Sequence, residues 1–189
     1  MVIEKREWKA SPDRSITIRS AVALDAESLC RHRYITSGET YFMARYPEEC
    51  QYDMDQVRKD LTSIEEHPRN FMVTAFDGDQ VIGDLGVRQI FSHMKYLHRA
   101  YMGISIQKAY CNLGLGRTLL EIAIAQTAQN GFEQLELGTF SDNLRALHLY
   151  EKYGFVRYGI QPRAFKLKDG TYRDEVIMVK MLGTNAENN

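Results

Sequence analysis

The chain has 189 residues, of which 44% are hydrophobic and 26% charged, a composition typical of one globular domain with a continuous core. Its formal net charge of -1 leaves no overall positive field for holding nucleic-acid phosphates. No segment reaches the roughly 18 consecutive apolar residues of a membrane-spanning helix, and the first residues lack the pattern of a secretion signal. We therefore expect a cytoplasmic protein without a nucleic-acid or membrane partner.

The cysteines and histidines show no spacing that gathers metal ligands. Cys30, Cys50 and Cys111 contain no CxxC pair, and their odd number argues against a disulfide framework. The five histidines contain no HxxxH or HExxH motif that would place two ligands on one helix face. These patterns predict reduced thiols and no metal site.

The N-terminal third predicts a strand followed by two helices. Residues 1–15 form an extension without assigned structure, and residues 16–20 read as a short strand. Asp25 is the expected N-cap of a helix that ends near residue 35. Residues 36–53 read as a loop with at most a short helix, because they lack periodicity. Residues 55–66 carry apolar positions at helical spacing and predict an amphipathic helix.

Strands dominate the next segment. Residues 71–76 and 80–87 are apolar strands, and the Asp77-Gly78 pair between them favours a tight antiparallel hairpin. After a polar connection, residues 98–106 predict a central strand. A glycine loop and an apolar helix of about fifteen residues follow this strand.

The C-terminal third predicts one more strand, one helix and a final hairpin. Residues 134–138 form the strand, residues 143–153 the helix, and residues 156–182 the hairpin, with its turn at Asp169-Gly170. Residues 183–189 read as a flexible tail. The order predicts a single α/β domain over residues 16–182, in which one mixed sheet carries helices on its faces.

Two motifs in residues 101–155 carry chemical information. Gly114 and Gly116 stand where a strand enters a helix, so they either expose N–H groups to a phosphate or simply permit a tight turn. The helix from Asn143 places Tyr150 on an apolar face, where the side chain either serves the site or packs in the core. Neither motif decides between its two interpretations.

Together the glycine loop and the pattern Asn-x-x-Ala-x-x-Leu-Tyr-x-x-x-Gly-Phe resemble the GCN5-related N-acetyltransferase (GNAT) family over residues 16–182. The resemblance implies an acyl-CoA N-acyltransferase fold, with a mostly antiparallel central sheet flanked by helices. Residues 168–180 resemble the final hairpin of members that act on small amines, amino acids or peptide N-termini. The family resemblance implies acetyl-CoA as cosubstrate, and the acceptor would be an amine of one of these three kinds.

The resemblance assigns roles residue by residue. Tyr150 matches the family tyrosine that sits near the thioester sulfur, where a phenol can protonate the leaving thiolate. The amine would attack directly in a ternary complex, without a covalent enzyme intermediate. The implied acetyl-CoA contacts lie on the strand end, the glycine loop and the last helix: Ile104, Ser105, Ile106, Asn112, Leu113, Gly114, Leu115, Gly116, Arg117 and Asn143.

Two positions depart from the family pattern. Cys111 stands where the family has Gln or Arg, and Tyr101 occupies the region of a family glutamate that acts as general base. His98 is our first candidate for the missing base, followed by Glu39 and Asp84. These departures keep an alternative open, a non-catalytic acyl-CoA-binding or sensing module.

Residues 36–53 and the final hairpin are expected to form the acceptor pocket. The segment contains aromatic and acidic side chains, which suit a cationic substrate or else pack the loop with solvated acids outside: Glu39, Tyr41, Phe42, Tyr46, Glu48 and Glu49. A homodimer is a further possible assembly of this chain.

Overall fold

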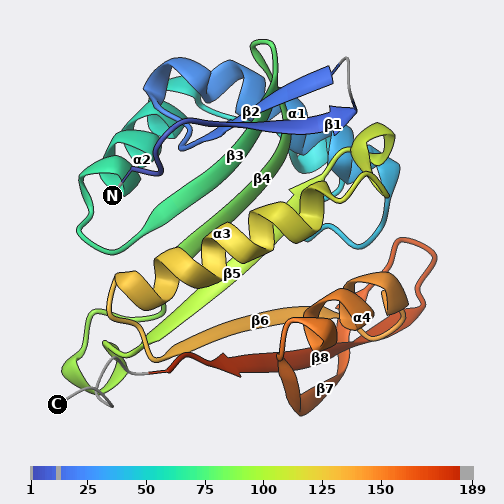
Figure 1. Ribbon diagram of the computed structural model, residues 1–189. Coiled ribbons are helices and arrows are strands. Elements are labelled where there is room, and N and C mark those ends of the chain that lie inside the picture. The colour runs from blue at the N-terminus through green and yellow to red at the C-terminus, as the bar shows by residue number, and fades with distance from the viewer. Residues whose placement is uncertain (1, 12–13, 184–189) are drawn as a thin grey trace, which may run out of the picture.

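A computed structural model describes residues 2–11 and 14–183 (Figure 1). Among these residues, eight strands form one sheet with the order β1-β2-β3-β4-β5-β6-β8-β7. The strands are β1 (Arg6–Ser11), β2 (Arg14–Arg19), β3 (Phe71–Asp77), β4 (Gln80–Gln89), β5 (Arg99–Ile106), β6 (Gln134–Phe140), β7 (Val156–Lys166) and β8 (Tyr172–Met181). The α-helices are α1 (Ala26–Glu39), α2 (Met54–Glu66), α3 (Leu115–Gln129) and α4 (Leu144–Lys152).

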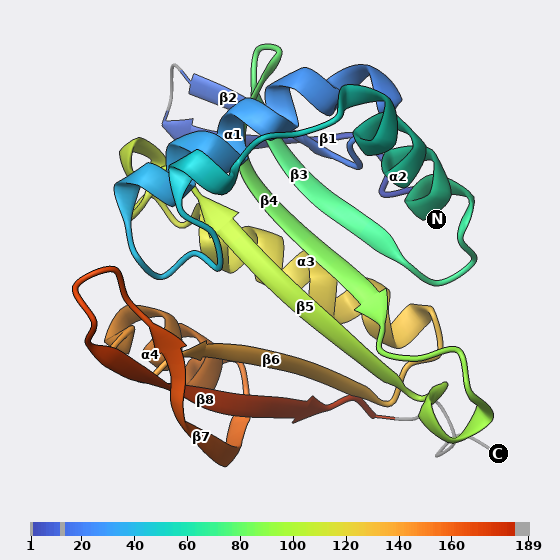
Figure 2. The same ribbon diagram turned by 180° about the vertical axis from the view of Figure 1, so that it is seen from behind.

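The mixed α/β prediction is confirmed, because every strand pair is antiparallel except β5 with β6. Helices α1 and α2 cover one face of the sheet, and α3 crosses the other, as Figures 1 and 2 show from opposite sides. Leu119 and Leu120 of α3 are fully buried against Leu85 and Met102 of the central strands. This packing fixes the strand-to-helix loop that precedes α3.

The N-terminal region differs from the sequence prediction. Residues 6–11 of the expected extension form β1, which pairs with β2 at the edge of the sheet. Asp25 does occupy the N-cap of α1, but its carboxylate makes no capping bond and instead pairs with Arg19 at 2.6 Å. The helix itself continues to Glu39, four residues beyond the predicted end at residue 35. Of the predicted tail, residues 184–189 lie outside the described residues.

No helix in the described part of the chain is long and apolar enough to span a bilayer.

The sheet opens between β5 and β6. These parallel strands pair only at three positions, the last of which joins Tyr101 to Glu136. Beyond that point β5 stays paired with β4 up to Ile106, whereas β6 stays paired with β8 up to Phe140. The two halves of the sheet therefore diverge, and the opening is visible in Figure 2.

A buried histidine ties α1 to the divergent end of β5. His32 is fully buried, and its Nε2 lies 2.8 Å from the Ser105 hydroxyl oxygen. Burial, with a smaller contribution from the Arg33 charge, lowers the pKa of His32 to about 4. The imidazole is therefore neutral in the folded protein over the physiological range.

This lowered pKa predicts that the protein loses stability in mild acid. In the unfolded chain the His32 imidazole takes up a proton near pH 6.5, whereas in the folded protein it does not. The contribution of His32 to the free energy of unfolding is therefore complete above pH 6.5. It falls as the pH drops toward 4, by about 3 kcal/mol in total. Urea unfolding of wild type and His32→Gln between pH 4 and 7 measures this contribution, and the variant should show the shallower dependence.

The matched control is His93→Gln, because His93 is exposed. It should keep the wild-type pH dependence. Identical slopes for His32→Gln and wild type would show that His32 is not the group responsible.

Candidate active site

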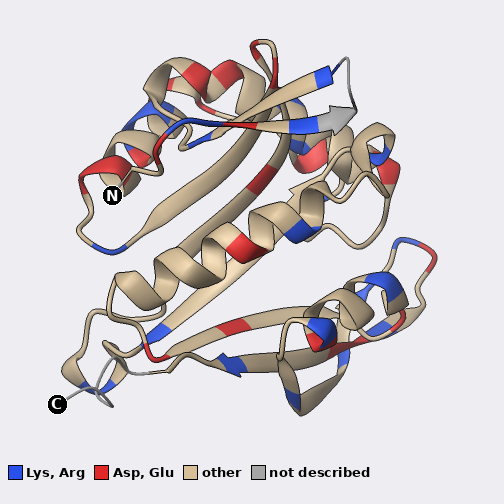
Figure 3. Cartoon of the chain, in the orientation of Figure 1, with Lys and Arg blue, Asp and Glu red and all other residues tan. Residues whose placement is uncertain are grey.

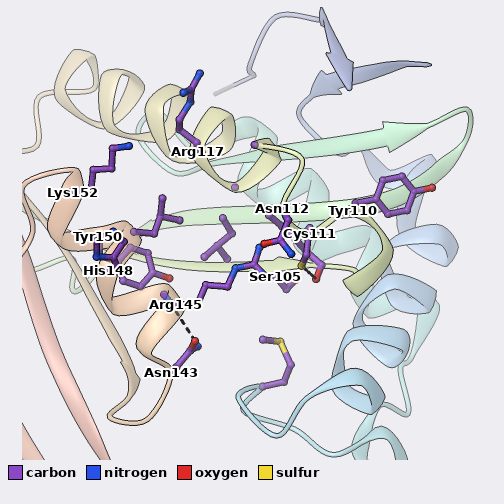
Figure 4. A pocket seen from close by; sticks show the side chains of 17 residues that line it. Ser105, Tyr110, Cys111, Asn112, Arg117, Asn143, Arg145, His148, Tyr150 and Lys152 are labelled. Carbon is purple, nitrogen blue, oxygen red and sulfur yellow. Dashed lines mark hydrogen bonds between the residues drawn. The ribbon is translucent and has the colours of Figure 1, made fainter. Parts of the chain in front are cut away.

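A cleft of about 440 Å³ lies at the divergent end of the sheet (Figure 4). The end of β5 and the loop before α3 form one side, α4 forms the other, and Met43 reaches in from the α1–α2 connection. The cleft thus sits where β5 lacks a neighbouring strand. The backbone N–H and C=O groups on that side of β5 have no strand to pair with. They can therefore form hydrogen bonds with a ligand, because buried peptide groups need partners.

The loop before α3 has the geometry of an anion site. Gly114 is the N-cap of α3 and has φ 92° and ψ -3°, a left-handed conformation that favours glycine. A Cβ on Gly116 would lie 3.2 Å from Ile106 Cδ1, so the missing side chain allows the first turn of α3 to approach β5 closely. The free N–H groups of this first turn therefore face the cleft region with little shielding.

Most residues expected to contact acetyl-CoA line this cleft. Those that do so are Ile104, Ser105, Ile106, Asn112, Gly114, Gly116, Arg117 and Asn143. The structure does not bring the side chains of Leu113 and Leu115 to it, because Leu113 is 43% exposed and Leu115 is fully buried in the core. Asn143 caps α4, and its Oδ1 accepts a bond from Ala146 N at 3.3 Å.

Three polar side chains of α4 in the cleft were not predicted. Arg145, His148 and Lys152 all line it and are labelled in Figure 4, and Lys and Arg positions are blue on α4 in Figure 3. Their spacing of i, i+3 and i+7 places them on one helical face. The same spacing is present in the sequence, although a polar face on a helix is equally typical of a surface exposed to solvent.

Tyr150 lies at the inner part of α4 and lines the cleft. It is 6% exposed, and its ring packs 5.8 Å from that of Phe155. Burial raises the pKa of the Tyr150 phenol above its usual range, so the hydroxyl stays protonated. Tyr150 therefore packs in the core and also lines the cleft, and its role in the site stays a prediction.

A second hollow of about 200 Å³ adjoins the first. The two share Met43, Ile104 and Ser105 as lining residues. The second hollow is also lined by six further side chains with hydrogen-bonding or charged groups: Arg33, Thr36, Ser37, Arg45, Tyr52 and Asp84. Burial raises the pKa of the Asp84 carboxyl, which accepts a hydrogen bond from Thr74 Oγ1 at 3.1 Å.

The structure does not bring His98 to either hollow. His98 precedes the first residue of β5, whereas the cleft begins near Ser105 at the other end of the strand. At about 3.3 Å per residue, the strand separates His98 from Ser105 by roughly 23 Å. His98 lies instead beside Glu133 and Arg69, in a separate depression. Its position argues against a role as general base.

Glu39 and Tyr101 also have structural partners. The Glu39 carboxylate accepts a bond from Lys108 N at 2.7 Å, which ties the end of α1 to the loop before α3. The Tyr101 hydroxyl accepts a bond from Gly138 N at 2.9 Å, just beyond the last β5–β6 pair. Of the three candidate bases, only Asp84 lines one of these two hollows.

The expected acidic wall is absent from the described lining of both hollows. Glu48 pairs with Lys168, and Glu49 accepts a bond from Tyr46 N at 2.8 Å. The aromatic side chains contact β6 and the final hairpin, since Phe42 packs 5.6 Å from Phe140 of β6 and the Tyr46 hydroxyl accepts a bond from Lys168 N at 3.0 Å. The segment therefore follows the alternative in which aromatic residues pack the loop and the acids face outward.

In the described part of the chain, no three His, Cys, Asp or Glu side chains gather as a metal site.

Comparisons with known proteins agree with this geometry. The model of the Acetyltransferase (GNAT) family matches residues 32–155. L-amino acid N-acetyltransferase AaaT of Escherichia coli is 30% identical over 112 residues, which cover 58% of this chain and 67% of that protein. Mycothiol acetyltransferase of Geodermatophilus obscurus is 27% identical over 128 residues, which cover 62% of this chain but only 38% of that relative.

Solved structures share the whole fold. A GNAT-family acetyltransferase from Streptococcus pneumoniae has a TM-score of 0.84 and 28% identity, covering 89% of this chain and 99% of that one. The yncA protein of Salmonella typhimurium, solved with its cofactor acetyl-CoA, has a TM-score of 0.77 at 19% identity. It covers 92% of this chain and 98% of its own, and it demonstrates the fold alone. From the family match and the shared fold, we conclude that the chain belongs to the GNAT family of acetyltransferases.

Proposed function

We propose that this protein transfers the acetyl group of acetyl-CoA to the primary amine of a small molecule, an amino acid or a peptide N-terminus. The observation that carries the proposal is the junction of two hollows at Ile104 and Ser105, with Tyr150 on one side and Asp84 on the other. Two substrates bound in these hollows would meet at the end of β5.

The names of two relatives support an amine acceptor. AaaT is described as an L-amino acid N-acetyltransferase. RimI of Mycobacterium tuberculosis, 31% identical over 100 residues, is described as an N-alpha-acetyltransferase. An amine acceptor agrees with the carboxyl of Asp84 in the second hollow, which can hold an ammonium group or accept its proton.

The larger cleft suits acetyl-CoA. The unpaired edge of β5 at residues 104–106 can bond the pantetheine amides, and the first turn of α3 offers N–H groups to the pyrophosphate. Arg145 and Lys152 add positive charge that can bind the ribose phosphate of CoA. In Figure 4 Arg117 points away from the group formed by Asn112 and Arg145, and its guanidinium lies 3.7 Å from Glu121.

The proposed reaction is a direct attack in a ternary complex. The neutral amine nitrogen bonds to the thioester carbonyl carbon, the carbonyl electrons shift to oxygen, and their return breaks the carbon–sulfur bond. The departing thiolate takes a proton from the Tyr150 hydroxyl, and the acceptor nitrogen gives one proton to Asp84. Solvent then returns a proton to Tyr150 and removes one from Asp84.

The burial of Tyr150 defines how it would act. A phenol with a raised pKa is a weaker acid than the free thiol, whose pKa is about 8.5. Tyr150 is therefore first a hydrogen-bond donor to the sulfur, stabilising the negative charge as it develops. Desolvation also raises the pKa of the thiolate in the same cleft, which favours completion of the proton transfer.

Binding and turnover experiments distinguish this proposal from an acyl-CoA-binding or sensing module. Titration calorimetry should detect acetyl-CoA binding to the purified protein, and its absence would contradict both functions. A thiol-release assay over amines, amino acids and peptides should then detect turnover. Binding without turnover on any acceptor would favour the sensing module, in line with the Tyr101 and Cys111 departures.

Tyr150→Phe should lower kcat by roughly 10²- to 10⁴-fold, because it removes the only proposed donor to the leaving sulfur. The Kd of acetyl-CoA should change little, since the ring remains. Tyr153→Phe is the matched control, because its hydroxyl bonds Glu121 at 2.7 Å outside the cleft. Steady-state kinetics and calorimetry measure the two effects, and full activity in Tyr150→Phe would remove this residue from the acid role.

Asp84→Asn should reduce kcat/KM by roughly 10²-fold or more, because an amide cannot accept the amine proton. In wild type, kcat/KM should fall as the pH drops through the raised pKa of this carboxyl, and the variant should lose that dependence. The exposed Asp79→Asn variant serves as control and should retain the wild-type profile. Unchanged turnover in Asp84→Asn would assign the proton to another acceptor.

A further inference from the structure

We propose that the acceptor is a free amino acid whose carboxylate is bound by Arg33 and Arg45. This inference rests on the acetyl transfer proposed above and specifies its acceptor. The two guanidinium groups come from different segments, since Arg33 lies on α1 and Arg45 on the connection to α2, yet both line the second hollow. A substrate with a negative charge fits this lining better than a purely cationic amine.

The two arginines differ from Arg19 and Arg99 of the sheet, which have carboxylate partners. Arg19 pairs with Asp25 at 2.6 Å, and Arg99 pairs with Glu136 at 2.5 Å. Arg33 is half-buried, but among the described residues neither Arg33 nor Arg45 has a carboxylate within 4 Å. A half-buried guanidinium without a counter-ion is a binding group for a planar anion such as a carboxylate, which it can contact through two N–H groups.

Asp84 and Arg33 provide opposite charges in one small space. The Arg33 charge lowers the pKa of Asp84, while burial raises it by more. The two groups influence each other without forming an ion pair within 4 Å in the described structure. A zwitterion satisfies both, because its ammonium group can face Asp84 while its carboxylate faces Arg33.

Tyr52 supplies a further hydrogen-bond donor. Its hydroxyl is buried and has no hydrogen-bond partner among the described residues, although the residue lines the hollow. Burial, together with the neighbouring Cys50, raises the pKa of Tyr52 to about 12, so the phenol keeps its proton. A buried hydroxyl without a partner is unfavourable, and a carboxylate oxygen that accepted its hydrogen bond would remove that penalty.

The size of the hollow favours a small acceptor. Its volume of about 200 Å³ lies below the ~300–1,000 Å³ of pockets for drug-sized ligands. A free amino acid carries its amine and its carboxylate on one carbon. Both groups can therefore reach the opposite charges of Asp84 and the two arginines within one small hollow. In a peptide N-terminus, the carbonyl next to the amine carries no charge, so the two arginines would remain without an anion.

A comparison of acceptors tests the inference. The common L-amino acids, their amides and short peptides are assayed by thiol release at saturating acetyl-CoA. For the best acid, kcat/KM should exceed that of its amide by roughly 10- to 100-fold, because the amide loses the charge-assisted bonds. Amides or peptides that react as well as the acids would overturn the carboxylate site and leave the acetyl transfer intact. No turnover with any acceptor would overturn both.

Variants connect the preference to these two side chains. Arg33→Gln and Arg45→Gln should each raise KM for the best amino acid by roughly 10-fold or more and reduce its advantage over the amide, while KM for acetyl-CoA stays near wild type. Arg31→Gln is the matched control, because Arg31 lies two residues from Arg33 on α1, is exposed and lines neither hollow. An equal rise in KM for Arg31→Gln, or none for the other two, would contradict the assignment.

Discussion

The opening between β5 and β6 is the constraint on which the rest of the site depends. Each strand is held on its outer side by a full antiparallel partner, β4 for β5 and β8 for β6. On the inner side the two strands separate after Tyr101 and Glu136. The Tyr101 hydroxyl accepts the Gly138 N–H at the point of separation, so this side chain replaces a lost strand contact. The departure at residue 101 thus has a structural explanation.

The separation leaves one edge of β5 without a strand and so creates a binding edge inside the sheet. Helix α3 crosses the central strands and delivers its first turn to this edge, while α4 approaches from the other half of the sheet. Backbone donors, a helix N-terminus and the cations of α4 therefore converge on one cleft. His32 supports the strand from behind, because its ring contacts the Ser105 hydroxyl.

Much of this organisation could be predicted because it is local in sequence. The hairpin at Gly78, the glycine loop at Gly114 and the capped helix from Asn143 each depend on residues close together in the chain. Strand β1 was missed because its charged residues lack the alternation of a half-buried strand. It lies at the sheet edge, where such residues remain solvated.

The long-range parts of the site could not be predicted from such patterns. The sequence predicts His98 as general base because this residue begins the strand that leads to the glycine loop. The apolar pattern of that strand, however, does not indicate which of its ends lies at the cleft. The partners of the acids are equally distant in sequence, since Glu48 pairs with Lys168 across 120 residues. The meeting of Arg33, Arg45 and Asp84 in one hollow likewise follows from tertiary packing alone.

Initial-velocity kinetics test the central claim most directly, because the account requires both substrates to be bound at the end of β5 before the acetyl group moves. Acetyl-CoA and the best acceptor are varied together, and reciprocal plots of the rates are compared. The account predicts lines that intersect, as expected for a ternary complex. Parallel lines, which indicate that CoA leaves before the acceptor binds and that the enzyme carries the acetyl group, would contradict it.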